Sequence, residues 1–189
     1  MASSLKDLKN KVVGTQKQIE KLQNQLAKDS EKLFKAGCKD IFKNNKDFFS
    51  FGWTQYTVHW NDGDPCEFSV YADSIYINDE DDPQDVYSLE SFYNDLKERD
   101  KSIVKLEKEI KKLEKEGQNN IWTVKANKER IADLQSANFE QIEKRYKFLK
   151  EVSNLLSSIN EDSFERMFGD HAKVVVTKDS INVENYEHD

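Results

Sequence analysis

The chain has 189 residues, of which 37% are hydrophobic and 34% are charged, and its formal net charge is −7 at pH 7. This composition is too polar for one compact core, but it suits elongated helices that each bury a single apolar seam. No apolar run reaches the length of a membrane span, and the N-terminus lacks the apolar core of a signal peptide, so we expect a cytoplasmic protein without membrane contact.

A long N-terminal stalk helix is predicted over residues 1–47. Its apolar positions recur at alternating spacings of three and four, which is the heptad pattern of a coiled coil. Thr15 and Asp29 interrupt the pattern, as polar residues that set register do. Gly37 is expected to end or kink the helix, and Asn44-Asn45 to stop it. The seam consists of Leu5, Leu8, Val12, Thr15, Ile19, Leu22, Leu26, Asp29, Leu33 and Ala36.

A β-meander with an acidic loop is predicted over residues 48–86, the stretch richest in aromatic and β-branched residues. The sequence NDGDP at residues 61–65 is a strong hairpin signal, because Asn, Asp and Gly tolerate the left-handed conformation of a turn. It joins a strand at Phe51–Trp60 to a strand at Cys66–Tyr71. Ala72-Asp73 then leads tightly into a third strand, Ser74–Asn78.

The alternation of side chains assigns the faces of these strands. The first strand changes phase, so we predict either a β-bulge near Thr54-Gln55 or a strand that is buried on both faces. Tyr71 and Tyr76 are expected on the outer face of the sheet, with Gln55 or Tyr56. The alternative is that the last hairpin or the short helix covers them. The core-facing set is Cys66, Phe68, Val70, Ile75 and Ile77.

An antiparallel helical hairpin is predicted over residues 87–160. Ser88 suits the start of its first helix, and the sequence GQNN at residues 117–120 interrupts the apolar pattern. Because so short a loop forces its two helices to run antiparallel, we expect a three-helix stalk together with the N-terminal helix. The seam of the first hairpin helix is Leu89, Phe92, Leu96, Arg99, Ile103, Leu106, Ile110 and Leu113.

The C-terminal segment, residues 161–189, is predicted to hold a short helix and a second β-hairpin. Asn160 suits the N-cap of a helix at 161–168, and two strand-like runs follow at Lys173–Thr177 and Asp179–Glu184. We expect this hairpin to pair with the strands of residues 48–86 in one antiparallel sheet. The predicted fold class is α+β: a long antiparallel three-helix coiled-coil stalk with a small antiparallel β-sheet head of about five strands.

Charge is segregated along the chain. Residues 51–100 contain thirteen acidic and two basic residues, and residues 170–189 contain five acidic and two basic residues, whereas the helical segments carry a net positive charge. An acidic head is attracted to basic protein surfaces and repelled by the phosphates of nucleic acids. The alternative is that the charge only keeps the sheet soluble. The predicted partner-binding residues are Asp62, Asp64, Glu67, Tyr71, Tyr76, Asp79, Glu80, Asp81, Asp82 and Asp85.

No metal, cofactor or catalytic residue is predicted. The carboxylates of residues 62–67 could approach those of residues 79–82 and hold Ca²⁺ or Mg²⁺, but the glycine and glutamate spacing of an EF-hand is missing. His59 near Cys66 lacks the further ligands of a zinc site, and no nucleophile or phosphate-loop signature occurs. Cys38 and Cys66 are too few for a disulfide framework, so both are expected to be reduced, with Cys66 in the core.

The segments FGWTQYT at residues 51–57 and NDGDPCEFSV at residues 61–70 resemble a motif of uncharacterised bacterial and bacteriophage proteins. That resemblance covers about a tenth of the chain and implies a prokaryotic or phage accessory protein of the cytoplasm. It brings no assigned activity, so no functional residue is carried over from it. For a phage-encoded protein it implies an inhibitor of a host nucleic-acid-handling or defence protein.

Three functions are consistent with these patterns. The leading hypothesis is a non-catalytic binding protein whose acidic head docks on a basic-surfaced partner, such as a nucleic-acid-binding host protein. The first alternative is a structural coiled-coil protein that forms homo-oligomers through the stalk, with the head as a passive cap. The second alternative is a divalent-metal-dependent enzyme that uses the carboxylates of the head.

Overall fold

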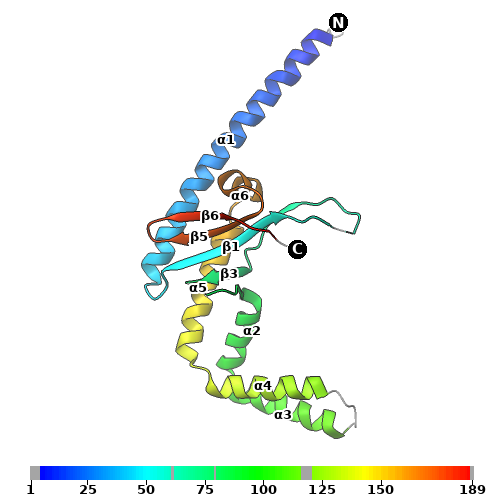
Figure 1. Cartoon of the computed structure of the whole chain (residues 1–189), viewed down its shortest axis with the longest axis vertical. Coiled ribbons are helices and arrows are strands. Elements are labelled where there is room, and N and C mark those ends of the chain that lie inside the picture. The colour runs from blue at the N-terminus through cyan, green and yellow to red at the C-terminus, as the bar shows by residue number, and fades with distance from the viewer. Residues whose placement is uncertain (1–4, 61, 79, 116–120, 188–189) are drawn as a thin grey trace. The chain divides into compact units, whose positions relative to one another are not determined.

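The computed structural model describes residues 5–60, 62–78, 80–115 and 121–187. Within them the chain has six helices and a six-stranded antiparallel sheet, which confirms the α+β class (Figure 1). None of the helices in these ranges combines the length and apolar character that a membrane span needs. Two compact units form, residues 1–83 with 152–189 and residues 84–151. The elements are α1 (Leu5–Asn44), β1 (Ser50–Thr57), β2 (Phe68–Val70), β3 (Ser74–Ile77), β4 (Gln84–Asp85), α2 (Val86–Lys97), α3 (Arg99–Lys115), α4 (Ile121–Ser136), α5 (Phe139–Ser157), α6 (Glu161–Phe168), β5 (Ala172–Thr177) and β6 (Ile181–Asn185).

The sheet of the first unit is built around β1. β5 pairs along one edge of β1 and carries β6 on its far side, so the C-terminal hairpin joins the sheet as predicted. β2 pairs with Gln55–Thr57 and β3 pairs with Phe51-Gly52, both on the other edge of β1. The predicted meander is therefore wrong. The turn at Ala72-Asp73 does not reverse the chain but returns it to the same edge of β1, so β2 and β3 lie end to end.

The register along β1 is continuous. The pairs with β5 run from Ser50↔Thr177 to Gln55↔Ala172 without an insertion, so the predicted bulge near Thr54-Gln55 does not occur. The alternative prediction, a strand buried on both faces, is confirmed for residues 50–55. The interruption in pairing lies on the other edge of β1, where residues 71–73 separate β2 from β3.

Aromatic side chains from α1, β1 and α6 form the core of the first unit. The ring of Trp53 lies 5.7 Å from Phe34, 5.7 Å from Phe164 and 5.5 Å from Phe168, each time edge to face. Such contacts add about 0.5–1.5 kcal/mol per pair to the burial of apolar surface. α6 also has the predicted bounds and the predicted N-cap, since the side chain of Asn160 accepts from the N–H of Ser163 at 3.2 Å.

Gln55 is a fully buried polar side chain in this core. Its Nε2 donates to the carbonyl of Gly169 at 2.6 Å and to that of Phe164 at 3.3 Å. Its Oε1 accepts from the indole N–H of Trp53 at 3.1 Å. One amide therefore satisfies the end of α6 and the largest core side chain, which links β1 to the helix that covers it.

α1 runs unbroken from Leu5 to Asn44, so Gly37 does not end it. A Cβ atom at Gly37 would lie 2.5 Å from Cδ1 of Leu155, which shows that glycine here permits close packing of α5. The helix stops at the predicted place, where the side-chain amide of Asn45 donates to the carbonyl of Ile41 at 2.9 Å.

The predicted three-helix stalk is not confirmed. α1 belongs to the unit of the sheet and docks through Phe34, Cys38, Ile41 and Phe42, which lie off the heptad seam. The seam itself is exposed from Leu5 to Leu26. The cysteine prediction is also corrected, because Cys38 is buried while Cys66, expected in the core, is exposed in the loop before β2.

The second unit is a helical hairpin in which each predicted helix is broken once. α2 and α3 meet at Glu98, and α4 and α5 meet at Ala137-Asn138. Arg99, predicted within the seam, lies at this corner, and its guanidinium donates to the carbonyl of Ala137 at 2.9 Å. The side chain of Asn138 accepts from the N–H of Glu140 at 3.1 Å and caps α5. Both breaks are therefore stabilised by side chains that satisfy helix ends.

Two tyrosine–carboxylate hydrogen bonds join α2 to α5 within the second unit. The hydroxyl of Tyr93 donates to Glu143 at 3.1 Å, and that of Tyr146 donates to Glu90 at 2.7 Å. The two tyrosine rings stack at 4.7 Å. The hydrogen bond from Tyr146 lowers the pKa of Glu90, and the same bond raises the pKa of Tyr146 to about 12.

Replacing Gln55 by methionine is expected to destabilise the protein by about 3 kcal/mol, because it leaves the N–H of the fully buried Trp53 without its acceptor and removes the hydrogen bond to the Gly169 carbonyl. Urea denaturation measures the change in the free energy of unfolding. Gln135, exposed on α4, provides the control, and Gln135→Met should change it by less than about 0.5 kcal/mol. Equal effects of the two substitutions would contradict the role of Gln55.

Gly52 and Gly14 should respond in opposite directions to replacement by alanine. A Cβ atom at Gly52 would lie 2.7 Å from the backbone oxygen of Val174, which cannot move without disturbing β5. Gly14 has no atom within 4 Å of such a Cβ and lies inside α1, where alanine is favoured by about 1 kcal/mol. Thermal unfolding should show a lower Tm for Gly52→Ala, and circular dichroism an unchanged or higher helix content for Gly14→Ala. A Gly52→Ala protein as stable as wild type would refute the assigned register.

Candidate functional site

One face of the sheet carries a row of four aromatic side chains, Tyr71, Tyr56, His171 and Tyr186, which we refer to as the aromatic row. The ring of Tyr56 stacks on Tyr71 at 4.5 Å, and it lies 5.5 Å from the ring of Tyr186 and 6.3 Å from that of His171. All four side chains are half-buried. The row therefore crosses the sheet from the edge that holds β2 to the edge formed by β6.

The strand register explains why these rings meet. Phe51, Trp53 and Gln55 of β1 face the core, so Tyr56 faces the other side. The antiparallel pairing of β1 with β5 ends at Gln55↔Ala172, and the next residues of the two segments are Tyr56 and His171, whose rings lie 6.3 Å apart. The N–H of Tyr186 donates to the carbonyl of His171 at 2.7 Å, which extends the pairing of β5 with β6 by one residue.

The same face holds a second aromatic group, Tyr76 of β3. The ammonium group of Lys173 lies 3.8 Å from the centre of the Tyr76 ring, which is a cation–π contact. Gly52 of β1 pairs with both Tyr76 and Val175, and its lack of a side chain leaves room between their strands. The expectation that Tyr71 and Tyr76 lie on the outer face with Tyr56 is thus confirmed. The alternative cover by the short helix is wrong, because α6 packs on the face of Trp53 and Gln55. The last hairpin pairs within the sheet as β5 and β6, and only the ring of Tyr186 after it packs against Tyr56 on this face.

Asp170 fixes the end of the aromatic row beside His171. Its carboxylate accepts from the backbone N–H of Thr57 at 2.7 Å and from that of His171 at 2.8 Å. Burial by itself would raise the pKa of Asp170, but the hydrogen bonds from these two residues outweigh it and lower the pKa. The carboxylate is therefore ionised at neutral pH. It also holds His171 in its left-handed backbone conformation, with φ of 52°.

The surroundings of the two tyrosines disfavour negative charge on their rings. Burial, followed by the hydrogen bond and charge of Tyr56, raises the pKa of Tyr71. Burial, followed by the charges of Tyr186 and Asp82, raises the pKa of Tyr76. Both phenols are therefore neutral at physiological pH, and each offers an uncharged π face next to carboxylates.

The acidic loops lie at opposite ends of β1. Asp62, Asp64 and Glu67 lie in the loop between β1 and β2, beyond the pair Thr57↔Phe68. Residues 80–82 follow Asn78, whose N–H donates to the carbonyl of Ser50 at the other end of the strand. At about 3.3 Å per residue the ends of β1 are roughly 23 Å apart. The prediction that the carboxylates of residues 62–67 could approach those of residues 79–82 is therefore wrong for the described residues.

This separation removes the geometric basis of a divalent-metal site in the head. Among the described residues, no group of three His, Cys, Asp or Glu side chains is placed to hold a metal ion. His59 does not approach a zinc ligand set either, and its ring stacks on that of His171 at 4.9 Å. His59 thereby extends the aromatic row toward the loop of residues 58–67.

The remaining predicted partner-binding residues have different positions. Glu80, Asp81 and Asp82 are exposed, and Asp82 lies near Tyr76 on the aromatic face. Asp85 is the N-cap of α2, since its carboxylate accepts from the N–H of Ser88 at 2.6 Å. That role corrects the predicted helix start at Ser88. Asp79 lies outside the described residues.

Sequence reasoning missed three members of this surface, His59, His171 and Tyr186, and it also missed the exposed Trp60 in the loop between β1 and β2. Trp60 is 77% exposed in the acidic loop, and its indole N–H donates to Asp62 at 3.0 Å. The alternation of β1 could have identified Tyr56 alone. The other rings lie outside the strands, where periodicity carries no information about facing.

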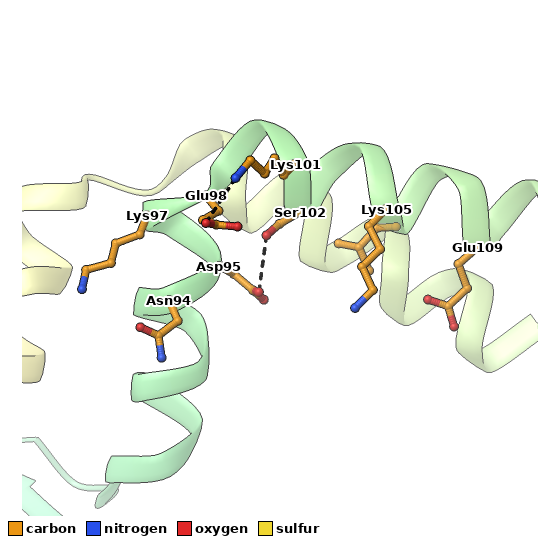
Figure 2. A pocket seen from close by; sticks show the side chains of 9 residues that line it. Asn94, Asp95, Lys97, Glu98, Lys101, Ser102, Lys105 and Glu109 are labelled. Atoms are coloured by element: carbon orange, nitrogen blue, oxygen red, sulfur yellow. Dashed lines mark hydrogen bonds and ion pairs between the residues drawn. The ribbon is translucent and has the colours of Figure 1, made fainter.

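The second unit contains an open hollow of about 710 Å³ on α2 and α3 (Figure 2). Its charged lining residues are largely paired already. Asp95 accepts from Ser102 at 3.5 Å and from Arg130 at 2.9 Å, and Glu98 pairs with Lys101 at 3.3 Å. Lys97 lies over the ring of Tyr93. These contacts hold the corner between the two helices, so the hollow is a weaker candidate than the aromatic face.

The chain matches no protein-family model, no curated protein and no solved structure, so its function is inferred from the geometry of the site.

The raised pKa values of Tyr71 and Tyr76 predict loss of stability at alkaline pH. The folded protein holds these protons more tightly than the unfolded chain, so their contribution is complete below about pH 10 and is lost as pH rises further. Absorbance at 295 nm should show tyrosines that ionise later in the native protein than in urea. Tyr71→Phe should reduce that late component. Superimposable native and denatured titration curves would contradict the burial of the tyrosine rings.

Proposed function

We propose that this chain is a non-catalytic accessory protein that binds another protein through the outer face of its sheet. One observation carries the proposal. The aromatic row and Tyr76 form a π-rich surface. The stretch from Ser50 to Asp85, which supplies Tyr56, Tyr71 and Tyr76, contains nine acidic residues and no lysine or arginine. Aromatic rings set among carboxylates fit a partner surface that presents lysine and arginine side chains.

The position of Lys173 supports this choice of partner. Its ammonium group already lies on the face of Tyr76, so this surface accepts a cation in the folded protein. An arginine of a partner could stack on the neighbouring Tyr56 and Tyr71 rings in the same way, with Asp73 and Asp170 near them to balance its charge.

The carboxylates of the loops are available for such a partner. Within the described ranges, Asp62, Asp64, Glu67, Asp81 and Asp82 form no ion pair with a lysine or an arginine of the chain. Charges at the rim of an interface mainly raise the association rate, and this effect weakens as the salt concentration rises. The two loops, one at each end of β1, would therefore steer a basic partner onto the rings between them.

The class of partner follows from charge and from the resemblance of residues 51–70. Phosphates would be repelled by this surface, so we propose a basic protein rather than a nucleic acid as the ligand. Proteins that handle nucleic acids carry basic grooves of this kind. The resemblance to bacteriophage proteins narrows the proposal to an inhibitor of a host nucleic-acid-handling or defence protein.

Capture from bacterial extract tests the proposal. Three proteins serve as bait: the wild-type chain, the double variant Tyr71→Ala/Tyr76→Ala and the control variant Tyr87→Ala. Tyr87 provides the control because its side chain is 64% exposed in the second unit. Quantitative mass spectrometry should find basic proteins with the wild-type and Tyr87→Ala baits at about 50 mM salt. The double variant should lose them at least about tenfold, and about 300 mM salt should weaken retention by wild type.

Circular dichroism and thermal unfolding verify that the double variant is folded. Retention that does not distinguish the double variant from Tyr87→Ala would exclude the aromatic face as the docking surface. Partners that are acidic, or retention that strengthens with salt, would exclude the basic class of partner.

A further inference from the structure

The N-terminal half of α1 exposes a complete apolar seam. Six side chains at heptad positions, in the stretch from Leu5 to Leu26, are each about half exposed or more, from 49% for Ile19 to 70% for Leu5. Every residue from 5 to 26 on this helix is exposed. A stretch of this length spans about 33 Å of helix, too long for a few scattered surface leucines. The apolar members are Leu5, Leu8, Val12, Ile19, Leu22 and Leu26.

The seam and the docking face of α1 lie on different sides of the helix. α1 packs on the sheet through Phe34, Cys38, Ile41 and Phe42. At about 100° per residue, the mean direction of these four positions lies roughly 100° around the helix from that of the seam. Leu33, which continues the seam next to Phe34, is accordingly 53% exposed. A second helix can therefore lie along the seam without meeting the sheet that α1 covers.

We propose that the seam binds the same seam of a second copy of this chain, as a parallel two-stranded coiled coil. The heptad places Leu5, Val12, Ile19 and Leu26 at the a positions and Leu8, Thr15 and Leu22 at the d positions. The two central a residues, Val12 and Ile19, are β-branched, and β-branched residues at a with leucine at d favour two parallel strands. The proposal concerns a surface separate from the aromatic face.

The single polar layer supports the parallel, in-register arrangement. In that register Thr15 meets only Thr15 of the second copy, and the six other layers are apolar. An antiparallel register would place Thr15 against an apolar residue twice. The hydroxyl of Thr15 already donates to the carbonyl of Lys11 at 3.0 Å, so it can be buried without an unsatisfied donor.

The flanking positions allow two identical helices to approach. The e and g positions beside the seam hold Lys9, Lys11, Gln16, Gln18, Gln23 and Gln25. In the parallel pairing of g with the next e, Lys11 meets Gln16 and Gln18 meets Gln23, so no like charges face each other. The nearly neutral flanks therefore fit a second copy, whereas a strongly charged partner would find few complementary charges here.

The area suffices for a specific interface. Six apolar side chains from each copy, at roughly 60–120 Å² apiece, bury on the order of 1,000 Å². This is near the lower limit of specific protein–protein interfaces. The dimer ends near Leu26, because Asp29 occupies the next d position and Ser30 is buried against Ser163 of α6.

Adjacent valines give a matched test. Val12 lies in the seam and is 56% exposed, while Val13 lies outside it and is 50% exposed. Val12→Asp places two carboxylates opposite each other in the dimer and should weaken dimerisation on the order of 100-fold. Val13→Asp makes the same chemical change on the same helix and should alter it less than about threefold. Sedimentation equilibrium measures the dimer dissociation constant of each full-length protein.

Wild type and Val13→Asp should show twice the 22.1 kDa mass of the chain at concentrations where Val12→Asp is a monomer. A wild type that is monomeric at about 100 µM, or equal effects of the two substitutions, would overturn the proposal. Both variants retain the aromatic face. The sedimentation experiment therefore tests only the dimer, and the capture experiment tests only the binding of a basic partner.

Cross-linking tests the orientation. In a Cys66→Ser background, which removes the exposed native cysteine, Leu8→Cys places a thiol near one end of the seam. A parallel in-register dimer brings the two introduced thiols together, and mild oxidation should give a covalent dimer on a non-reducing gel. An antiparallel dimer separates them by most of the length of the seam. If the protein with Leu8→Cys sediments as a dimer but gives no covalent dimer on oxidation, the parallel arrangement is overturned.

Discussion

The burial of β1 on both faces and its pairing along both edges is the constraint on which the rest of the first unit depends. Trp53 and Gln55 bind this strand to α1 and α6 through edge-to-face rings and through hydrogen bonds to the end of α6. A strand held in this way cannot slip, because a shift by one residue would exchange its two faces. The orientation of every other strand follows from the register of β1.

That register also creates the candidate binding surface. Because Phe51, Trp53 and Gln55 occupy the core face, Tyr56 necessarily lies on the other side, and the paired strands bring His171 and Tyr186 into line with it. Neighbouring strands are separated by about 4.8 Å, which is close to the stacking distance of aromatic rings. The aromatic row is thus a consequence of sheet geometry, and its rings are preorganised before any partner arrives.

The first unit presents two surfaces of different chemistry. The aromatic face offers π surfaces among carboxylates, which suit a basic partner and respond to salt. The seam of α1 offers an apolar stripe with nearly neutral flanks, which suits a second helix of the same kind. Two copies joined through α1 would present two aromatic faces on one particle, and paired sites of this kind raise the apparent affinity for a partner that carries repeated basic surfaces.

Sequence by itself determined the local features: the α+β class, the heptad seam of α1, the capped helix after Asn160, the C-terminal hairpin and the outward Tyr71 and Tyr76. These depend on periodicity and on turn and cap residues within a few positions. Only the tertiary structure decided that β2 and β3 share one edge of β1, that Arg99 and Asn138 stabilise breaks in the long helices, and that the acidic loops lie at opposite ends of a strand. The heptad seam of α1 shows the same limit, because a periodic apolar stripe favours packing against another helix but does not specify which helix.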